Sequence, residues 1–382
     1  MSVPGVGSRH ASWLELFYDL LFVALFAQLA HGLVADPGLA TTLRVLGFFA
    51  PAWWVWVSAT VSSNLYGEWG AAHRLLTLTS MACLLLMTGG IASALDGDPA
   101  LYAAGFAASR LALLVLVVVW AQRNPDAERP VPSYVCYSIS AVLWAASIPL
   151  GPPAGYVLWA VALAVELGVR IQEQAVQRRR HVARPWDVEL LVERFGLLMM
   201  VALGEGVVQI ATSMSHTDPA AGVVTSGLAG FAIVATLWWG YFDFASGPAT
   251  DAFEQLEAKA DSDWAVYRLA RDAFIYGHFF LVGAVVAAAA GIGAVVQAAV
   301  TGEGSAAGDV RLLCDALALY LVTGAILAVR TGADARRTSL VTALLIAGLG
   351  AVGLAADHLA PPLALAVVAL VLLPGRLDPR RP

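Results

Sequence analysis

Long apolar stretches separated by short polar ones recur along the 382-residue sequence. A helix needs roughly 20 residues to cross about 30 Å of hydrocarbon, so each stretch of that length predicts a membrane span. Twelve stretches reach or approach this length, at residues 13–34, 42–63, 73–95, 101–122, 133–150, 153–171, 190–214, 221–245, 272–298, 311–330, 338–356 and 360–375. The fifth, sixth and twelfth are short or flanked by proline, so we expect eleven or twelve spans.

Composition agrees with this pattern. Apolar residues make up 59% of the chain and charged residues 13%, against about 45 to 50% and 25% in ordinary globular proteins. The mean hydropathy is +0.74. Because lipid offers no hydrogen bonds to the backbone, the sequence predicts an all-α, polytopic integral membrane bundle of about twelve helices.

The basic residues predict an orientation. With the N-terminus inside, eighteen of the 22 Lys and Arg residues fall on the inner side of the membrane. Arg44 and Arg311 fall outside, and Arg110 and Arg194 lie within spans. Since cytoplasmic loops hold most Lys and Arg, both termini are expected to be cytoplasmic.

Spaced polar residues suggest that the chain repeats itself. The same four- and twelve-residue offsets separate Glu15, Asp19 and His31 in the first stretch, and Glu189, Glu193 and Glu205 in the seventh. We therefore expect two six-helix halves, 1–172 and 189–382, joined by a basic cytoplasmic linker at 173–188. Residues 251–271 are expected to form an amphipathic cytoplasmic segment within the second half. Chance similarity among apolar helices is the alternative.

Four motifs resemble those of a known family. They are WLELFYDLLFVALFAQL at 13–29, ERFGLLMMVALGE at 193–205, WWGYFDFA at 238–245 and YGHFFLVGAVVAAAAGI at 276–292. In this order they resemble the bacterial low temperature requirement A (LtrA) family. The resemblance implies a multi-pass protein of the bacterial cytoplasmic membrane, and it implies no particular reaction or substrate.

Charged residues inside apolar stretches are the candidates for a functional site. A charge near the bilayer centre costs roughly 2.5 to 3.5 kcal/mol on insertion scales, so it needs a partner, a water-filled cavity or a task. Glu205 lies mid-helix between Gly204 and Gly206, where desolvation disfavours the charged carboxylate, as a proton carrier requires. The other substrate- or ion-binding candidates are Glu15, Asp19, His31, Arg110, Glu193, Arg194, Asp243, His278 and Asp315.

Each of these candidates also has a structural interpretation. Buried charges can form ion pairs that join helices, and groups near a helix end can extend to the interface. Aromatic residues leave two interpretations as well, because they can form an interface belt or line a cavity. The aromatic candidates are Trp53, Trp54, Trp238, Trp239 and Tyr241.

Several classes of chemistry lack a signature in the sequence. The chain has no phosphate-binding loop, dinucleotide fingerprint, nucleophile elbow, zinc-ligand spacing or aspartate-rich diphosphate motif. We therefore expect no cofactor, no metal and no nucleic acid, with the lipid bilayer as a partner.

Three functions remain open. The first is a proton- or cation-coupled transporter of a small molecule, in which Glu205 carries the ion and Glu193 and Arg194 form a charge pair that switches partners. The second is an intramembrane enzyme that acts on a lipid or isoprenoid-like substrate, with Glu205 or Asp243 as general acid. The third is a membrane scaffold or sensor. Substrate and oligomeric state stay open.

Overall fold

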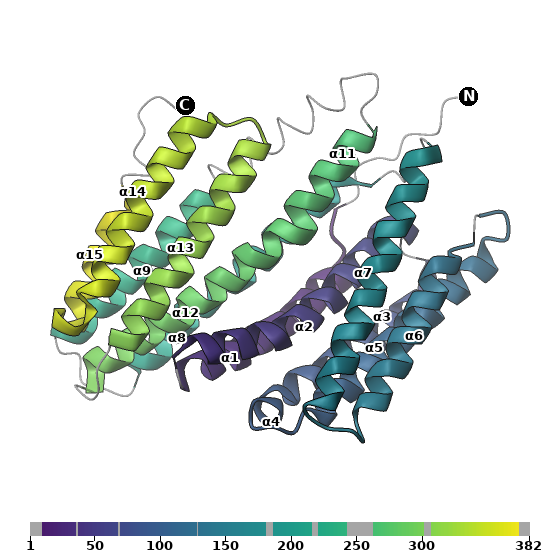
Figure 1. The fold of residues 1–382 in the computed structure, drawn as a ribbon, viewed down its shortest axis with the longest axis horizontal. Coiled ribbons are helices and arrows are strands. Elements are labelled where there is room, and N and C mark those ends of the chain that lie inside the picture. Colours follow the sequence, from purple (N-terminus) through teal and green to yellow (C-terminus); the bar gives the residue numbers. More distant parts are fainter. Residues whose placement is uncertain are drawn as a thin grey trace. The chain divides into compact units, whose positions relative to one another are not determined.

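The computed structural model describes residues 10–35, 37–67, 69–127, 129–180, 186–215, 221–242, 263–301 and 307–373, and these residues form helices and no β-strand (Figure 1). Ten helical segments among them are long and apolar enough to cross a membrane. Two further apolar helices, Val131–Ser147 and Pro361–Leu372, are shorter. The predicted all-α polytopic architecture is confirmed.

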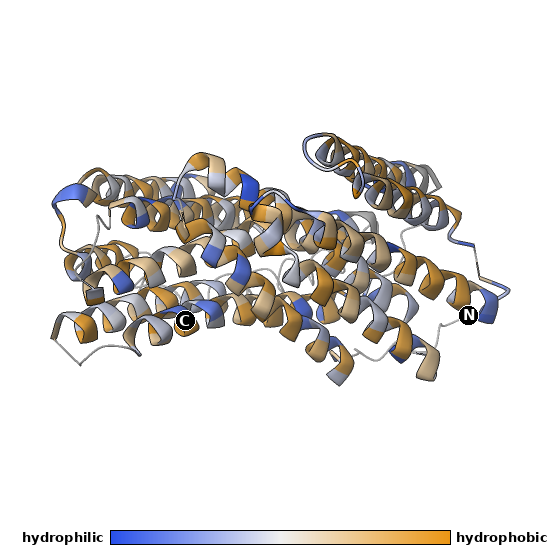
Figure 2. Ribbon diagram, turned by 90° about the horizontal axis from the view of Figure 1, so that it is seen from below, coloured by the Kyte–Doolittle hydropathy of each residue, from blue (hydrophilic) through white to orange (hydrophobic). Residues whose placement is uncertain are grey.

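Hydrophobic side chains cover the helices on the outside as well as inside. Figure 2 shows hydrophobic residues along most of the helices. Leu340 and Leu344 on one helix, and Leu228 and Phe231 on another, are exposed. A water-soluble protein rarely exposes contiguous apolar surface of this kind, whereas lipid accepts it. The outward surface is therefore that of a membrane protein.

By internal contacts the chain divides into two compact units, 1–28 with 44–194 and 29–43 with 195–382. The first unit contains most of α1 (Trp13–Ala35) and α2 (Leu39–Tyr66), then α3 (Gly70–Gly89), α4 (Ile91–Leu95), α5 (Ala100–Arg123), α6 (Val131–Ser147), α7 (Ala154–Arg180) and the first turns of α8 (Val188–Met214). Helix α5 packs against α3 and α6, and α6 packs against α7.

Aromatic rings fill the core of this first unit. Trp144 stacks on Phe106 and on Trp159, with ring centroids 4.0 and 4.2 Å apart. All three side chains are buried. Stacked pairs of this kind add about 0.5 to 1.5 kcal/mol beyond the area they bury, so they hold α5, α6 and α7 together.

The second unit contains the rest of α8, then α9 (Ala221–Tyr241), α11 (Asp263–Ala270), the π-helix η2 (Arg271–Gly277), α12 (His278–Thr301), α13 (Ala307–Arg330), α14 (Ala335–Leu354), the 3₁₀ turn η3 (Ala356–His358) and α15 (Pro361–Leu372). Helix α12 packs against α9, α13 and α15. Helix α14 packs against α13 and α15, and α15 also packs against α9.

In both units, helices that follow one another in the sequence pack together. The series α3, α5, α6, α7 has its counterpart in α12, α13, α14, α15. A duplicated chain would have this order, although short connections alone also favour contacts between neighbours. Residues 29–43 group with the second unit and residues 189–194 with the first, so the units differ from the predicted halves at both points. Duplication stays a prediction.

Three predicted segments differ in detail from the structure. The third span is interrupted at Gly90, which lies between the end of α3 and the start of α4. A Cβ atom at Gly90 would lie 2.6 Å from the backbone nitrogen of Tyr102, so glycine allows α5 to approach closely at this break. Helix α7 continues to Arg180 into the predicted linker, because 171–180 contains helix-forming Gln, Glu, Ala and Arg. Residues 251–262 of the predicted amphipathic segment lie outside the described residues; 263–301 form one helical segment.

Candidate functional site

The first buried charge cluster centres on Arg194 in the first turns of α8. Its Nη2 donates to Oδ1 of Asp19 at 2.8 Å, and its Nη1 lies 3.5 Å from Oε1 of Glu15. Both acids come from α1, four residues apart, and all three side chains are buried. The i,i+4 spacing places both carboxylates on one helix face, so that one guanidinium serves both.

Two further side chains hold this cluster in place. Trp56 on α2 donates from Nε1 to Oδ1 of Asp19 at 2.7 Å, and the Arg194 guanidinium lies 5.5 Å from the Trp56 ring centroid. Ser63, also on α2, donates to Oε1 of Glu15. The cluster therefore joins α1, α2 and the start of α8 by charge-assisted hydrogen bonds.

A small cavity of about 40 Å³, lined by both apolar and polar residues, borders the Arg194 cluster. A site of this size has room for water. Its polar lining consists of Glu15, Tyr18, Ser62, Ser63, His73, Thr77, Ser80 and Arg194. The hydroxyls of Tyr18 and Ser80 are 3.3 Å apart, which links α1 to α3. The buried charges of Glu15 and Arg194 therefore border a space that can hold water.

The second buried cluster joins α5, α7 and α2. Nε of Arg110 donates to Oε1 of Glu166 at 2.8 Å, and Nε1 of Trp54 donates to Oε2 of the same carboxylate at 2.6 Å. The guanidinium lies 4.3 Å from the centroid of the Phe106 ring. The Glu166 carboxylate thus has a cation and an indole N–H as partners, and the Arg110 guanidinium lies on an aromatic face. Contacts of this kind hold helices together.

Glu205 has a different environment, within the second unit. Its side chain is 1% exposed, and Oε1 accepts a hydrogen bond from Nε2 of Gln209 at 2.7 Å. Oε2 is buried without a hydrogen-bond partner. Among the residues that the structure describes, no cationic side chain pairs with this carboxyl. Glu205 is therefore a buried acid without a counter-charge.

Close helix packing creates the surroundings of Glu205. A Cβ atom on Gly206 would lie 2.9 Å from Cγ2 of Val234 on α9 and 3.7 Å from Cβ of Ala289 on α12. On Gly293 it would lie 2.8 Å from Cβ of Gln209. The two glycines thus allow α8, α9 and α12 to approach closely. Gly204 meets nothing within 4 Å.

His278 and Tyr241 form a third buried polar contact, between α12 and α9. Nδ1 of His278 lies 2.8 Å from the carbonyl oxygen of Ala273, so Nδ1 carries a hydrogen. In the neutral ring Nε2 then accepts from the Tyr241 hydroxyl at 2.7 Å. Ala273 belongs to the π-helix η2, and such segments are frequent at functional sites.

The structure separates the remaining candidates. Glu193 is half-buried and accepts from the backbone nitrogen of Ala11 at 2.9 Å, so it has different partners from its neighbour Arg194. His31 and Asp315 are exposed on α1 and α13. Asp243 lies outside the described residues.

The two tryptophan pairs have different settings. In the first unit Trp53 packs on Phe49, with centroids 5.9 Å apart, while Trp54 faces Glu166. On α9, Trp238 and Trp239 are 44% and 40% exposed. Exposure of this extent fits contact with lipid. Tyr241 is buried beside His278.

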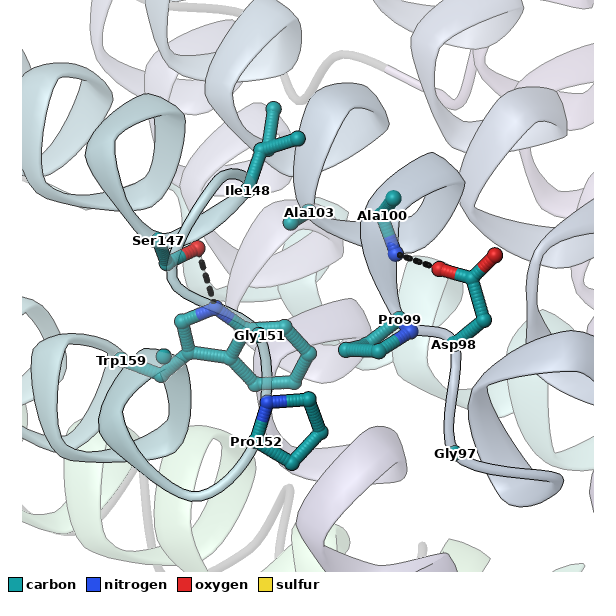
Figure 3. Close-up of a pocket in the computed structure, with 11 residues that line it drawn as sticks. Gly97, Asp98, Pro99, Ala100, Ala103, Ser147, Ile148, Gly151, Pro152 and Trp159 are labelled. Atoms are coloured by element: carbon teal, nitrogen blue, oxygen red, sulfur yellow. Dashed lines mark hydrogen bonds between the residues drawn. The ribbon is translucent and has the colours of Figure 1, made fainter.

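A larger cavity of about 200 Å³ lies where the loops before α5 and α7 meet (Figure 3). Trp159 lines it and donates from Nε1 to Oγ of Ser147 at 2.8 Å. The single charged residue of the lining is Asp98, whose Oδ1 accepts from the backbone nitrogen of Ala100 at 3.2 Å. Since that carboxylate already accepts from the first backbone amide of α5, the cavity offers little for ion binding.

The sequence marks Glu166 and Trp56 as unusual residues, but it does not show which candidates they contact. Glu166 is a carboxylate in an apolar stretch, which needs a cation or a strong donor as a neighbour in lipid. Trp56 belongs to the tryptophan-rich second stretch. The structure shows that these two residues complete the charge clusters around Arg110 and Arg194.

Membrane-length helices, lipid-compatible surfaces and charges buried between helices define a multi-pass helical membrane protein. The chain belongs to the family of bacterial low temperature requirement A proteins (LtrA), whose model matches residues 10–373. An uncharacterized protein of Rhizobium meliloti (strain 1021) is 28% identical over 287 residues, covering 74% of this chain and 68% of the relative. No solved structure matches the chain significantly.

Proposed function

We propose that this protein is a proton- or cation-coupled transporter of a small molecule, with Glu205 as the ion-carrying group. The observation that carries the proposal is the isolation of the Glu205 carboxyl, which is buried with one amide partner and no cation. Intramembrane acids in such positions belong to proton relays and ion paths.

The isolation matters because the other buried acids are neutralised locally. Asp19 contacts Arg194, and Glu166 contacts Arg110. Those pairs satisfy the requirement that charges in lipid be compensated, so they need no mobile ion. Glu205 meets the same requirement by holding a proton or a bound cation. A group whose neutrality depends on a mobile ion is what coupling requires.

Arg194 supplies a second element of the proposed mechanism. It is shared by Glu15 and Asp19 beside a wettable cavity, so a change in protonation of either acid would redistribute its hydrogen bonds. In the proposal, this exchange links ion entry to a rearrangement within the first unit. In the proposal both termini lie in the cytoplasm, an orientation that the distribution of Lys and Arg along the sequence supports.

Proteoliposomes test this function. Purified protein is sealed in vesicles with an internal pH dye, and candidate cations and organic solutes are offered outside under imposed pH and potential gradients. Wild type is compared with Glu205→Gln, which keeps shape and loses the titratable proton. Asp315→Asn is the matched control, because Asp315 is an exposed acid of the second unit.

We expect a solute that drives proton flux in wild type and in Asp315→Asn, and no coupled flux in Glu205→Gln of equal folding. Equal flux in Glu205→Gln and wild type contradicts the assignment to Glu205. If lipids from expressing cells instead carry a new product that Glu205→Gln abolishes, the protein is an enzyme and the transport proposal is wrong.

A further inference from the structure

We infer that the Glu205 carboxyl holds its own proton in the resting protein and is a modification site for lipid-soluble carbodiimides. The inference rests on the carboxyl invoked in the proposed function and adds a chemical state and a reactivity. It is carried by the burial of Glu205, the position of Gln209, and the groups that α9 and α12 contribute to the junction.

Among the residues that the structure describes, no cationic side chain pairs with the Glu205 carboxyl, whose one hydrogen-bond donor is the neutral amide of Gln209. At the adjacent Gly206, a Cβ atom would meet Val234 on α9 and Ala289 on α12, neither of which titrates. An isolated carboxylate in such a medium is far costlier than its neutral acid. The neutral acid is therefore the form that this junction accepts.

Gln209 positions the carboxyl. Its amide Nε2 donates to Oε1 at 2.7 Å, so Oε1 serves as the carbonyl oxygen and the proton resides on Oε2. Oε2 accepts no hydrogen bond in the structure. Gly293 makes room for the Gln209 side chain, because a Cβ there would lie 3.0 Å from the Gln209 Oε1 atom. Gln209 is a positioning residue in this scheme.

A protonated carboxyl in an apolar site reacts with carbodiimides in two steps. The acid transfers its proton to one carbodiimide nitrogen, and the carboxylate oxygen bonds to the central carbon to give an O-acylisourea. The acyl group then moves to the neighbouring nitrogen as the C–O bond breaks, which leaves a stable N-acylurea. No atom is lost, and no further reactant is required. Exclusion of water favours this rearrangement over hydrolysis.

The protein contains its own reference acids for this reaction. Asp19 and Glu166 are as deeply buried as Glu205, but each contacts a guanidinium at 2.8 Å. The guanidinium compensates a negative charge at these two positions, whereas no cationic side chain of the described residues pairs with Glu205. If burial alone determined reactivity, the three acids would be labelled equally. If the lack of a neighbouring cation determines reactivity, Glu205 is labelled in preference to Asp19 and Glu166.

The test treats the full chain in lipid nanodiscs with dicyclohexylcarbodiimide at neutral pH, followed by peptide mass spectrometry. The expected result is one added carbodiimide on Glu205, with little or none on Asp19 or Glu166, whose carboxylates contact guanidinium groups. Glu205→Gln abolishes this label, and Glu205→Asp retains part of it. A water-soluble carbodiimide labels exposed Asp126, in the loop that follows α5, instead.

Absence of the label on Glu205, or equal labelling of Glu166, overturns the inference. Infrared spectroscopy provides a second measurement that needs no reagent access, because wild type should show a carboxylic acid carbonyl band that Glu205→Gln lacks. Missing label and missing band, with coupled flux intact, would reject the resting protonation and keep the transporter. If the label and the band are present but no coupled flux is found, the resting protonation of Glu205 is kept and the transporter proposal is rejected.

Discussion

Arg194 and Asp19 meet at 2.8 Å in the interior of the first unit, where α8 begins beside α1. Nearby, Glu15 contacts the same guanidinium at 3.5 Å. Because the two acids depend on one cation, the stability of this unit should depend strongly on Arg194.

Arg194→Met should destabilise the protein by about 3 to 5 kcal/mol, since it leaves two buried carboxylates without their guanidinium. The measurement is the temperature at which half of the protein leaves the monodisperse peak on size-exclusion chromatography in detergent. Glu193→Gln, at the adjacent half-buried position, is the control and should stay close to wild type. Equal melting of Arg194→Met and wild type would show that the cluster contributes nothing to stability.

The Arg110 and Glu166 pair should behave as a structural lock. Arg110→Met leaves the carboxylate unpaired, at a cost of about 3 to 5 kcal/mol, whereas adding Glu166→Gln removes the charge and keeps an acceptor for Trp54. The double variant should therefore melt above Arg110→Met alone. If the double variant melts at a lower temperature than Arg110→Met alone, the loss of stability in Arg110→Met does not come from the unpaired Glu166 carboxylate.

Gly293→Ala should disturb the junction around Glu205. The added methyl would lie 2.8 Å from Cβ of Gln209, and overpacking of this kind costs about 1 to 3 kcal/mol. Gly324→Ala on α13 is the matched control, because its methyl meets nothing within 4 Å and alanine favours the helix by about 0.5 to 1 kcal/mol. Opposite shifts in melting temperature are expected. Shifts of the same sign would argue against tight packing at Gly293.

Tyr241→Phe removes the hydroxyl that donates to Nε2 of His278 and leaves a buried ring nitrogen unsatisfied. The expected cost is about 1 to 3 kcal/mol, measured by the same chromatographic melting. Tyr276→Phe serves as the control, since Tyr276 is exposed. If both variants lose equal stability, the Tyr241 hydroxyl has no special part in the contact.

Most of the fold could be predicted because each helix in lipid must satisfy its own backbone, which makes apolar run length decisive. The run at 101–122 corresponds to α5 at Ala100–Arg123. Hydropathy carries no information about hydrogen-bond register, so neither the π-helix η2 nor the break at Gly90 was predicted. Both depend on what packs against the segment.

Candidate side chains could be identified, but their partners could not. Glu193 and Arg194 were expected to pair, yet consecutive helical residues do not face each other, and Arg194 contacts Asp19 from a helix distant in sequence. Depth along a span predicted that Glu205 would be buried, which the structure bears out. His31 matched Glu205 in spacing, but it is exposed, because spacing alone does not determine which helix face meets the core.

Counterflow in proteoliposomes tests the central claim most directly, once a transported solute is found. Glu205→Gln, which mimics the protonated acid, should still exchange labelled for unlabelled solute and should lose accumulation driven by a proton gradient. Retention of gradient-driven accumulation by Glu205→Gln, with folding equal to wild type, would contradict the account, because the coupling proton would then reside on another group.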